Sequence, residues 1–286
     1  MRIEAKNLTY IYGLGLPWEK KAVDDVSFEV EEGEFVALIG ETGSGKSTLV
    51  QLLTGLLKPN SGQVLVDGRA VFQEPKALKE IRSRIGLVFQ FPEEQLFAET
   101  VYEDVAFGPR NIGVPASEID SRVEEALLKV GLNPNSIRDR SPFSLSGGEK
   151  RLVAIAGVLA MEPKVLILDE VTAGLDPKGK KDILARIQLL HAKEKATIVM
   201  VSHDMDEVVA LVERVIILKN GKKTLDGSPK EIFSHPELVI DQGLALPTLP
   251  RLFWELQKCG WDVPSAVFDL REAVLLLVEK AKDATL

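Results

Sequence analysis

The stretch FVALIGETGSGKSTL, residues 35–49, decides the fold. It opens with the apolar run Phe35 to Ile39, which is typical of a strand buried on both faces of a parallel sheet. The following GETGSGKS, residues 40–47, has the full spacing of a phosphate-binding loop that leads into a helix. Glycines let such a loop wrap closely around phosphates, while its N–H groups and the helix N-terminus attract negative charge. The stretch therefore predicts an α/β fold with a nucleotide phosphate site.

Within this loop we expect Lys46 to neutralise the outer phosphates and Ser47 to ligate Mg²⁺. The nucleotide-binding residues that we predict here are Gly40, Glu41, Thr42, Gly43, Ser44, Gly45, Lys46, Ser47 and Thr48.

Other apolar runs extend the predicted sheet. The runs 165–168, 197–201 and 215–218 are continuously apolar, as buried parallel strands are. Near the start, residues 3–12 and 23–30 alternate apolar and polar side chains around a glycine-rich loop, which predicts an antiparallel hairpin.

Helical patterns follow. Residues 117–130 have the spacing of an amphipathic helix, and we expect a helical subdomain from about residue 91 to about 160. From about residue 241, apolar residues at helical spacing predict a small tail. We therefore expect one domain over residues 1–240 and a C-terminal helical tail over 241–286.

Two carboxylates, Asp169 and Glu170, end the predicted strand over 165–168. In such folds the carboxyl ends of the strands form the ligand-binding edge, so the phosphates should lie beside them. We predict that Asp169 holds the Mg²⁺ shell. Glu170 would be the general base that polarises water for in-line attack on the terminal phosphorus.

A more specific motif is LSGGEKR, residues 145–151, which precedes an apolar helix. Gln90 follows the run 85–89, AGLD at 173–176 follows the carboxylates, and His203 follows the run 197–201. With these motifs in this order over roughly residues 1–230, the chain resembles the ABC ATPases. The resemblance implies a phosphate-loop ATPase core that binds ATP and Mg²⁺, with an antiparallel β subdomain, an inserted helical subdomain and a short helical tail.

The same resemblance implies roles for further residues. Tyr12 would stack on adenine, with Tyr10 as the alternative because both share one face of a strand. Gln90 would contact Mg²⁺ and the attacking water and sense the membrane partner, and His203 would bond the terminal phosphate. Residues that would serve the ATP across a head-to-tail dimer are Ser146, Gly147, Gly148 and Asp176.

The stretches 86–97, 103–111 and 226–233 look like energy-coupling factor importers of vitamins or transition-metal ions. That resemblance implies a second ATPase subunit, identical or different, and a transmembrane coupling protein, with a substrate-binding membrane protein beside it. The ATPase of another ABC importer or exporter is the alternative. A non-transport ABC protein acting on ribosomes or DNA is less favoured, because no heptad run or second ATPase domain is evident.

Two residues depart from the family pattern. Val171 stands where proline usually follows the catalytic glutamate, and this change could relax the backbone that positions Glu170. Glu149 stands where this branch commonly has glutamine.

Charge and composition argue against some ligands and indicate where the protein is located. A formal net charge of −8 argues against nucleic acid as a ligand, and basic clusters such as Lys178 to Lys181 read as solvated faces. The single cysteine, Cys259, is expected to be a buried packing residue. Neither a signal peptide nor an apolar run near the roughly 20 residues of a spanning helix is evident. We therefore expect a peripheral protein on the cytoplasmic face of the cell membrane.

The segment Phe91 to Phe97 joins the catalytic edge to the helical subdomain. It mixes apolar residues with Glu93 and Glu94, which predicts a groove for an amphipathic cytoplasmic helix carrying basic residues. The alternative is subdomain core beside a solvated acidic turn.

Overall fold

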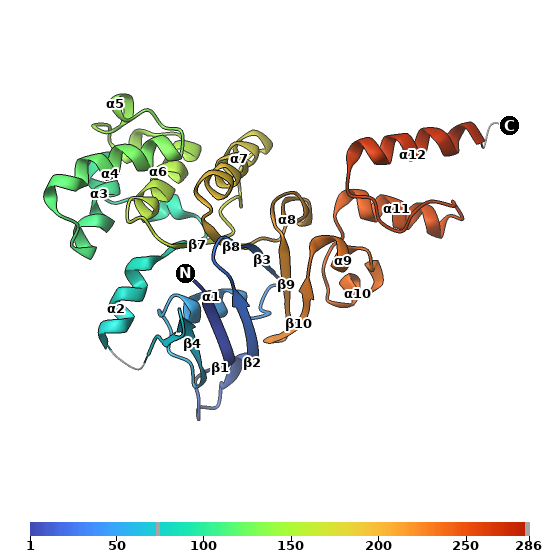
Figure 1. Cartoon of the computed structure of the whole chain (residues 1–286), viewed down its shortest axis with the longest axis horizontal. Coiled ribbons are helices and arrows are strands. Elements are labelled where there is room, and N and C mark those ends of the chain that lie inside the picture. The colour runs from blue at the N-terminus through green and yellow to red at the C-terminus, as the bar shows by residue number, and fades with distance from the viewer. Residues whose placement is uncertain (73–74, 284–286) are drawn as a thin grey trace.

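The computed structural model describes residues 1–72 and 75–283, and its centre is a six-stranded sheet (Figure 1). The strand order is β10-β9-β3-β8-β7-β6, and every strand except β10 runs parallel to its neighbours. In this order the strands are Lys222–Gly227, Arg214–Lys219, Phe35–Ile39, Thr197–Val201, Val165–Asp169 and Ile85–Val88. The predicted parallel sheet is confirmed.

The central strands alternate their side chains between two buried layers. Phe35, Ala37 and Ile39 of β3 lie in the layer that also contains the helical insertion. Val36 and Leu38 lie in the other layer, with the antiparallel sheet and α1 (Lys46–Leu53). Because both faces are covered, the whole strand can be apolar.

A four-stranded antiparallel sheet of order β2-β1-β4-β5 packs below the central sheet (Figure 1). The predicted hairpin is confirmed, because β1 pairs with β2 from Ile3 opposite Val30 to Tyr12 opposite Lys20. The strands are Ile3–Tyr12, Lys20–Val30, Ser61–Val66 and Arg69–Ala70 for β1, β2, β4 and β5. Helix α2 (Pro75–Arg84) leads from this sheet to β6.

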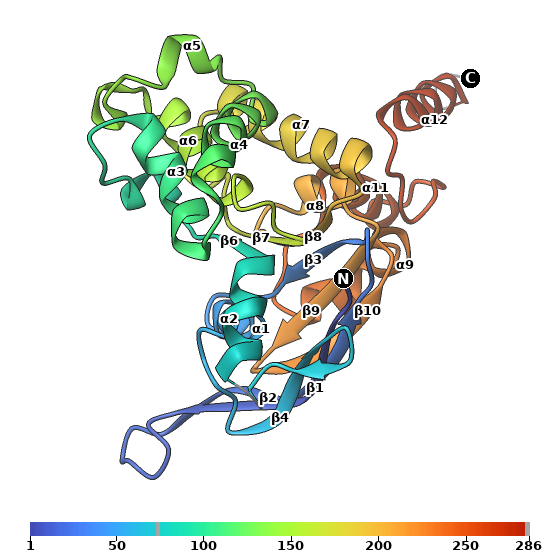
Figure 2. The same ribbon diagram turned by 60° about the vertical axis from the view of Figure 1, so that its left-hand side comes forward.

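Residues 91–160 are all described, and they form helices without any strand. These helices lie at one end of the molecule in both ribbon views (Figures 1 and 2). The elements are η1 (Pro92–Gln95), α3 (Val101–Ile112), α4 (Ala116–Lys129), α5 (Pro134–Ile137), η2 (Pro142–Ser144) and α6 (Gly147–Leu159).

The remaining helices follow β7, β8 and β10. They are α7 (Pro177–Glu194), α8 (Met205–Leu211), α9 (Pro229–Phe233), α10 (Pro236–Asp241), α11 (Thr248–Lys258) and α12 (Leu270–Asp283). The last two helices pack around a small core of their own, which contains Phe253 and Ala273. They lie at the opposite end of the molecule from the helical insertion (Figure 1).

The prediction for Cys259 is wrong. This residue ends α11 as its C-terminal cap and is exposed, because the small tail has too little interior to enclose it. Among the described helices, none has the length and apolar character needed to cross a membrane.

Candidate functional site

The carboxyl ends of the parallel strands bring the predicted site residues to one edge. The phosphate loop follows β3, Glu170 follows β7, His203 follows β8 and Gln90 follows β6. Register places Asp169 opposite Val201, so the ends of β7 and β8 are level. Residues far apart in the sequence therefore meet because their strands are parallel and adjacent.

The phosphate loop is shaped by close backbone approaches. A side-chain carbon on Gly45 would lie 2.3 Å from the carbonyl oxygen of Ala22, and φ at Gly45 is +107°. Only glycine suits such a position. The Lys46 ammonium is buried and donates to the carbonyl oxygens of Gly40 at 2.7 Å and Glu41 at 3.0 Å. Ser44 Oγ is buried without a hydrogen-bond partner in the described chain, as expected of a group that awaits a ligand.

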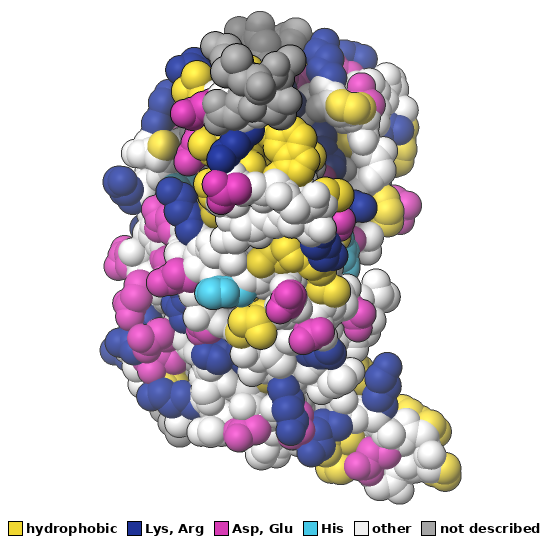
Figure 3. All heavy atoms as spheres, turned by 90° about the vertical axis from the view of Figure 1, so that its right-hand side faces the viewer, with side chains coloured by type: hydrophobic (Ala, Val, Ile, Leu, Met, Phe, Trp, Pro, Cys, Tyr) yellow, Lys and Arg dark blue, Asp and Glu magenta, His cyan; other side chains and the backbone are white. Residues whose placement is uncertain are grey.

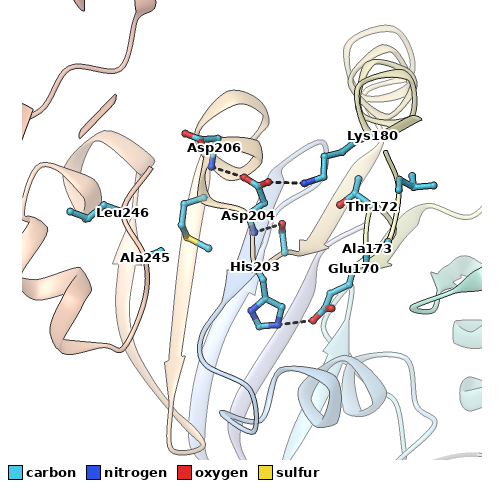
Figure 4. Close-up of a pocket in the computed structure, with 13 residues that line it drawn as sticks. Glu170, Thr172, Ala173, Lys180, His203, Asp204, Asp206, Ala245 and Leu246 are labelled. Carbon is cyan, nitrogen blue, oxygen red and sulfur yellow. Dashed lines mark hydrogen bonds and ion pairs between the residues drawn. The ribbon is translucent and has the colours of Figure 1, made fainter. Parts of the chain in front are cut away.

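Glu170 is the centre of the catalytic edge. One carboxylate oxygen lies 2.7 Å from Nε2 of His203, and the other accepts a hydrogen bond from Nε2 of Gln90 at 2.9 Å. Figure 4 shows the His203 ring turned toward this carboxylate. Two residues that follow β6 and β8 thus converge on the one carboxylate that follows β7.

Asp169 and Lys46 face the same region and alter each other's ionisation. Burial raises the pKa of Asp169, and the neighbouring Glu170 carboxylate raises it further. Burial lowers the pKa of Lys46, while Glu170 and Asp169 act in the opposite direction. Charges of both sign are therefore gathered where phosphates and a cation would meet.

The two candidate tyrosines occupy different environments. Tyr12 lines a cavity of about 160 Å³ together with the loop residues Gly43, Lys46 and Ser47. Its hydroxyl lies 3.2 Å from Oγ1 of Thr48, and its side chain is exposed. Tyr10 packs against the core and contacts the Tyr12 ring edge to face. This geometry favours Tyr12 as the residue available to a nucleobase.

The signature residues do not join this cavity. Ser146 caps α6 and forms a capping box with Glu149, whose carboxylate accepts from the Ser146 backbone N–H at 2.9 Å. This hydrogen bond lowers the pKa of Glu149, which thus serves a capping role that glutamine could also fill. Gly147 and Gly148 have open space where a side chain would stand. Asp176 caps α7 through Gly179.

Arg151 is a residue that the sequence analysis did not single out. Its side chain is among the largest that are fully buried, and it pairs with Glu93 of η1. Glu93 is therefore engaged by Arg151 and only partly exposed, whereas Glu94 is exposed, and the predicted groove stays a prediction. The sequence signals for Arg151 were its place at the end of the motif LSGGEKR and at the start of an apolar helix, and neither points to Glu93 as its partner.

Glu207 on α8 is a second residue that the sequence analysis missed. One of its buried carboxylate oxygens accepts from Thr172 Oγ1 at 3.1 Å and Ser202 Oγ at 3.0 Å. The other lies 3.0 Å from the Lys180 ammonium. Lys180 also donates to Asp204 at 2.7 Å, a hydrogen bond that raises the pKa of Lys180 (Figure 4). Lys180 is therefore not part of a simple solvated face. The hydrogen bonds around Glu207 connect α7 to the loops after β7 and β8.

An apolar cavity of about 380 Å³ lies on the helical insertion, between η1, α3 and α6. Phe97 and Phe107 line it and meet edge to face, with ring centroids 4.9 Å apart. Both rings remain exposed, at 59% and 49% of their surface. Exposed aromatic pairs beside a hollow are typical of an interaction surface.

The family model described as ABC transporter matches residues 23–173. The chain is 50% identical to the energy-coupling factor transporter ATP-binding protein EcfA2 of Clostridium perfringens over 279 residues, or 98% of each protein.

Solved structures of ATP-binding cassettes are also similar to this chain. The structure of cbiO1 from Clostridium perfringens, part of the ABC transporter complex cbiONQ, matches with a TM-score of 0.75 and 39% identity. The match covers 90% of this chain and 98% of that one. The ATP-binding cassette MJ0796, a dimer bound to ADP and Pi in a post-hydrolysis state, matches with a TM-score of 0.70 and 31% identity. That match covers 79% of this chain and 98% of that one.

Proposed function

Because this chain belongs to the ABC transporter family, among the ATP-binding proteins of energy-coupling factor transporters, we propose that it drives import of a vitamin or a transition-metal ion. It binds and hydrolyses ATP. The observation that carries the catalytic proposal is the convergence of Gln90 and His203 on the Glu170 carboxylate.

In the proposed reaction Glu170 accepts a proton from water as the water oxygen attacks the terminal phosphorus of ATP. The bond between that phosphorus and the bridging oxygen breaks, which gives ADP and phosphate. His203 binds the terminal phosphate, and Gln90 orients the water. Lys46, whose ammonium donates to the carbonyl oxygens of Gly40 and Glu41, would neutralise the charge of the outer phosphates.

Mg²⁺ fits the donors available at this edge. Ser47, Gln90 and Asp169 would hold it, and Mg²⁺ prefers oxygen ligands, commonly one or two carboxylates completed by phosphates and water. Bound Mg²⁺ supplies charge neutralisation at the outer phosphates.

The complete site requires a second ATPase subunit. Tyr12 and the phosphate loop line one cavity, whereas Ser146, Gly147 and Gly148 lie elsewhere on the chain, at the start of α6. We infer that these signature residues bind the ATP held by the partner, and that Asp176 communicates across the interface. A helix N-terminus with two glycines suits a phosphate group.

The partner in the membrane would dock on the cavity lined by Phe97 and Phe107. This surface is apolar and exposed, and Glu94 beside it is free to meet a basic side chain. An amphipathic cytoplasmic helix of a transmembrane coupling protein has these properties. Such docking would place the chain at the cytoplasmic face of the cell membrane as a peripheral subunit.

The tail is proposed as a contact between the two ATPases. Exposed apolar side chains gather on the side of the molecule that carries α11 and α12 (Figures 1 and 3). On α12 they include Leu270, Val274, Leu275 and Val278, which are between 49% and 70% exposed. A matching tail on the second subunit would cover them. The division of the chain at residue 240 remains part of this proposal.

Co-purification from solubilised membranes tests the transport assignment. We expect the full-length chain to bring down a second ATPase and a transmembrane protein that does not itself bind ATP. Recovery of ribosomes or DNA instead would support a non-transport role. Recovery of ATPase subunits with transmembrane subunits, but without a separate substrate-binding membrane protein, would support another kind of ABC transporter.

A further inference from the structure

Arg151 lies in the first turns of α6 and is only 2% exposed. Its guanidinium grips Glu93, with Nε 2.9 Å from one carboxylate oxygen and Nη2 2.5 Å from the other. Nη1 donates to the carbonyl oxygens of Val171 at 2.9 Å and Ala173 at 2.7 Å. One side chain thus joins α6, η1 and the loop that follows β7.

These contacts require an arginine. The planar guanidinium presents several N–H groups in a fixed fork, so it can satisfy a carboxylate on one side and two carbonyls on another. A lysine at this position would carry the same charge on one nitrogen and could not reach all four acceptors. Because Arg151 is buried, its charge must be paired, since a buried unpaired charge would destabilise the fold.

The guanidinium lies between two unusual turns. Glu170 and Phe91, which directly follows Gln90, both have left-handed backbone conformations, with φ of 50° and 54°. Such conformations are unfavourable for residues other than glycine and persist where the surroundings hold them. The two turns lie close together, since a side-chain carbon added to Gly174 would come within 3.5 Å of the Phe91 ring.

We propose that Arg151, held by Glu93, is a positioning residue that fixes the backbone turn carrying Glu170 and links it to the segment that faces the membrane partner. A shift of η1 moves Glu93, and through the guanidinium it moves the carbonyls of Val171 and Ala173. The carboxylate of Glu170 then changes its place relative to the attacking water. This inference rests on the proposed role of Glu170 as the base.

The contacts of Arg151 also bear on Val171, which stands where the family usually has proline. Proline would restrict the backbone at and before its own position, whereas valine leaves it freer. In this chain the Val171 side chain is buried and its carbonyl is held by Arg151. The guanidinium therefore supplies a constraint on the loop that proline does not provide here.

Arg151→Lys and Glu93→Gln test the proposal in the full-length chain, purified in the complex that it forms and altered in every copy. Arg214→Lys is the matched control. Arg214 also grips a carboxylate with Nε and Nη2, that of Asp226, and donates through Nη1 to the carbonyl of Glu29. It lies at the start of β9, at the opposite edge of the sheet from Glu170.

The measurements are the equilibrium Kd for ATP, the number of nucleotides bound per chain, the melting temperature and kcat per binding-competent site. For Arg151→Lys and Glu93→Gln we expect kcat to fall about 10- to 100-fold, since small misplacements at a catalytic group have such effects. The Kd for ATP should stay within about twofold, because neither residue approaches the phosphate loop. Arg214→Lys should lower the melting temperature without changing kcat.

Three results would overturn the proposal. They are an unchanged kcat in Arg151→Lys, a loss of kcat matched by Arg214→Lys, or effects of Arg151→Lys and Glu93→Gln that simply add in the double variant. A shared link predicts that the double variant is no slower than the slower single one. Glu170→Gln, measured in parallel, separates this inference from the proposed function: if it stays active, the base assignment itself fails.

Discussion

Nε2 of His203 lies 2.7 Å from a carboxylate oxygen of Glu170, although the two residues follow different strands. This contact holds the histidine close to the place where we put the terminal phosphate. We predict that His203→Ala lowers kcat for ATP hydrolysis by about 10²-fold, as the loss of a single transition-state hydrogen bond does. Nucleotide affinity, measured by equilibrium binding, should change much less. A variant with wild-type turnover would remove His203 from the reaction.

Lys46→Ala should weaken ATP binding and hydrolysis together. The ammonium contacts the phosphates in the ground state and in the transition state, so its loss affects both. Isothermal titration with ATP and steady-state assays measure the two effects on one preparation. Lys6→Ala on β1 is the control and should leave both values unchanged, because the exposed Lys6 side chain pairs with Glu4 and is not part of the phosphate loop. Unaltered ATP affinity in Lys46→Ala would count against the assignment.

Glu207→Gln should destabilise the fold. The buried carboxylate accepts hydrogen bonds from Thr172 and Ser202 and pairs with Lys180. The amide keeps one acceptor oxygen, so not every hydrogen bond of about 1.5–3 kcal/mol is lost, and the partly exposed Lys180 adds little; we therefore expect a total loss of about 2 kcal/mol. Urea unfolding followed by circular dichroism measures it.

A matched control for Glu207→Gln lies at the end of α7, which is the helix that carries Lys180 near its start. Glu194 forms an ion pair with Lys129 at 3.0 Å, and both side chains are partly exposed. Glu194→Gln should therefore alter the free energy of unfolding by less than about 1 kcal/mol. Equal effects of the two changes would mean that the Glu207 network adds nothing beyond a surface ion pair.

The membrane contact is tested best at Glu94, because Glu93 pairs with Arg151. Glu94→Lys should lower the yield of the assembled transporter by charge reversal and leave ATP binding intact. Glu125→Lys, a change of the same kind at an exposed position on α4, should not alter the yield. Wild-type yield for Glu94→Lys, with normal transport in vesicles, would place the partner elsewhere.

Local patterns in the sequence predicted the parallel strands and the phosphate loop, because apolar runs and glycine spacing report directly on burial and backbone shape. The polar edge strand β10 and the half-polar strand β4 were missed, since neither has such a run.

The side-chain links around the site were also beyond the sequence. Glu93 and Arg151 are 58 residues apart, and only the packing of η1 on α6 brings them together. The prediction for Cys259 was wrong because it relied on residue type alone. Cysteine is commonly buried, but this one lies in a tail too small to bury it.

The most direct measurement is the turnover of Glu170→Gln. The change removes the base and preserves the shape of the side chain, so ATP binding should remain while multiple-turnover hydrolysis is almost lost. Kd for ATP and release of phosphate are measured on the same complex, with every ATPase subunit altered at its catalytic glutamate. Retained binding with turnover reduced by at least about 10²-fold is the predicted result. Near-normal phosphate release over many turnovers would contradict the role of Glu170.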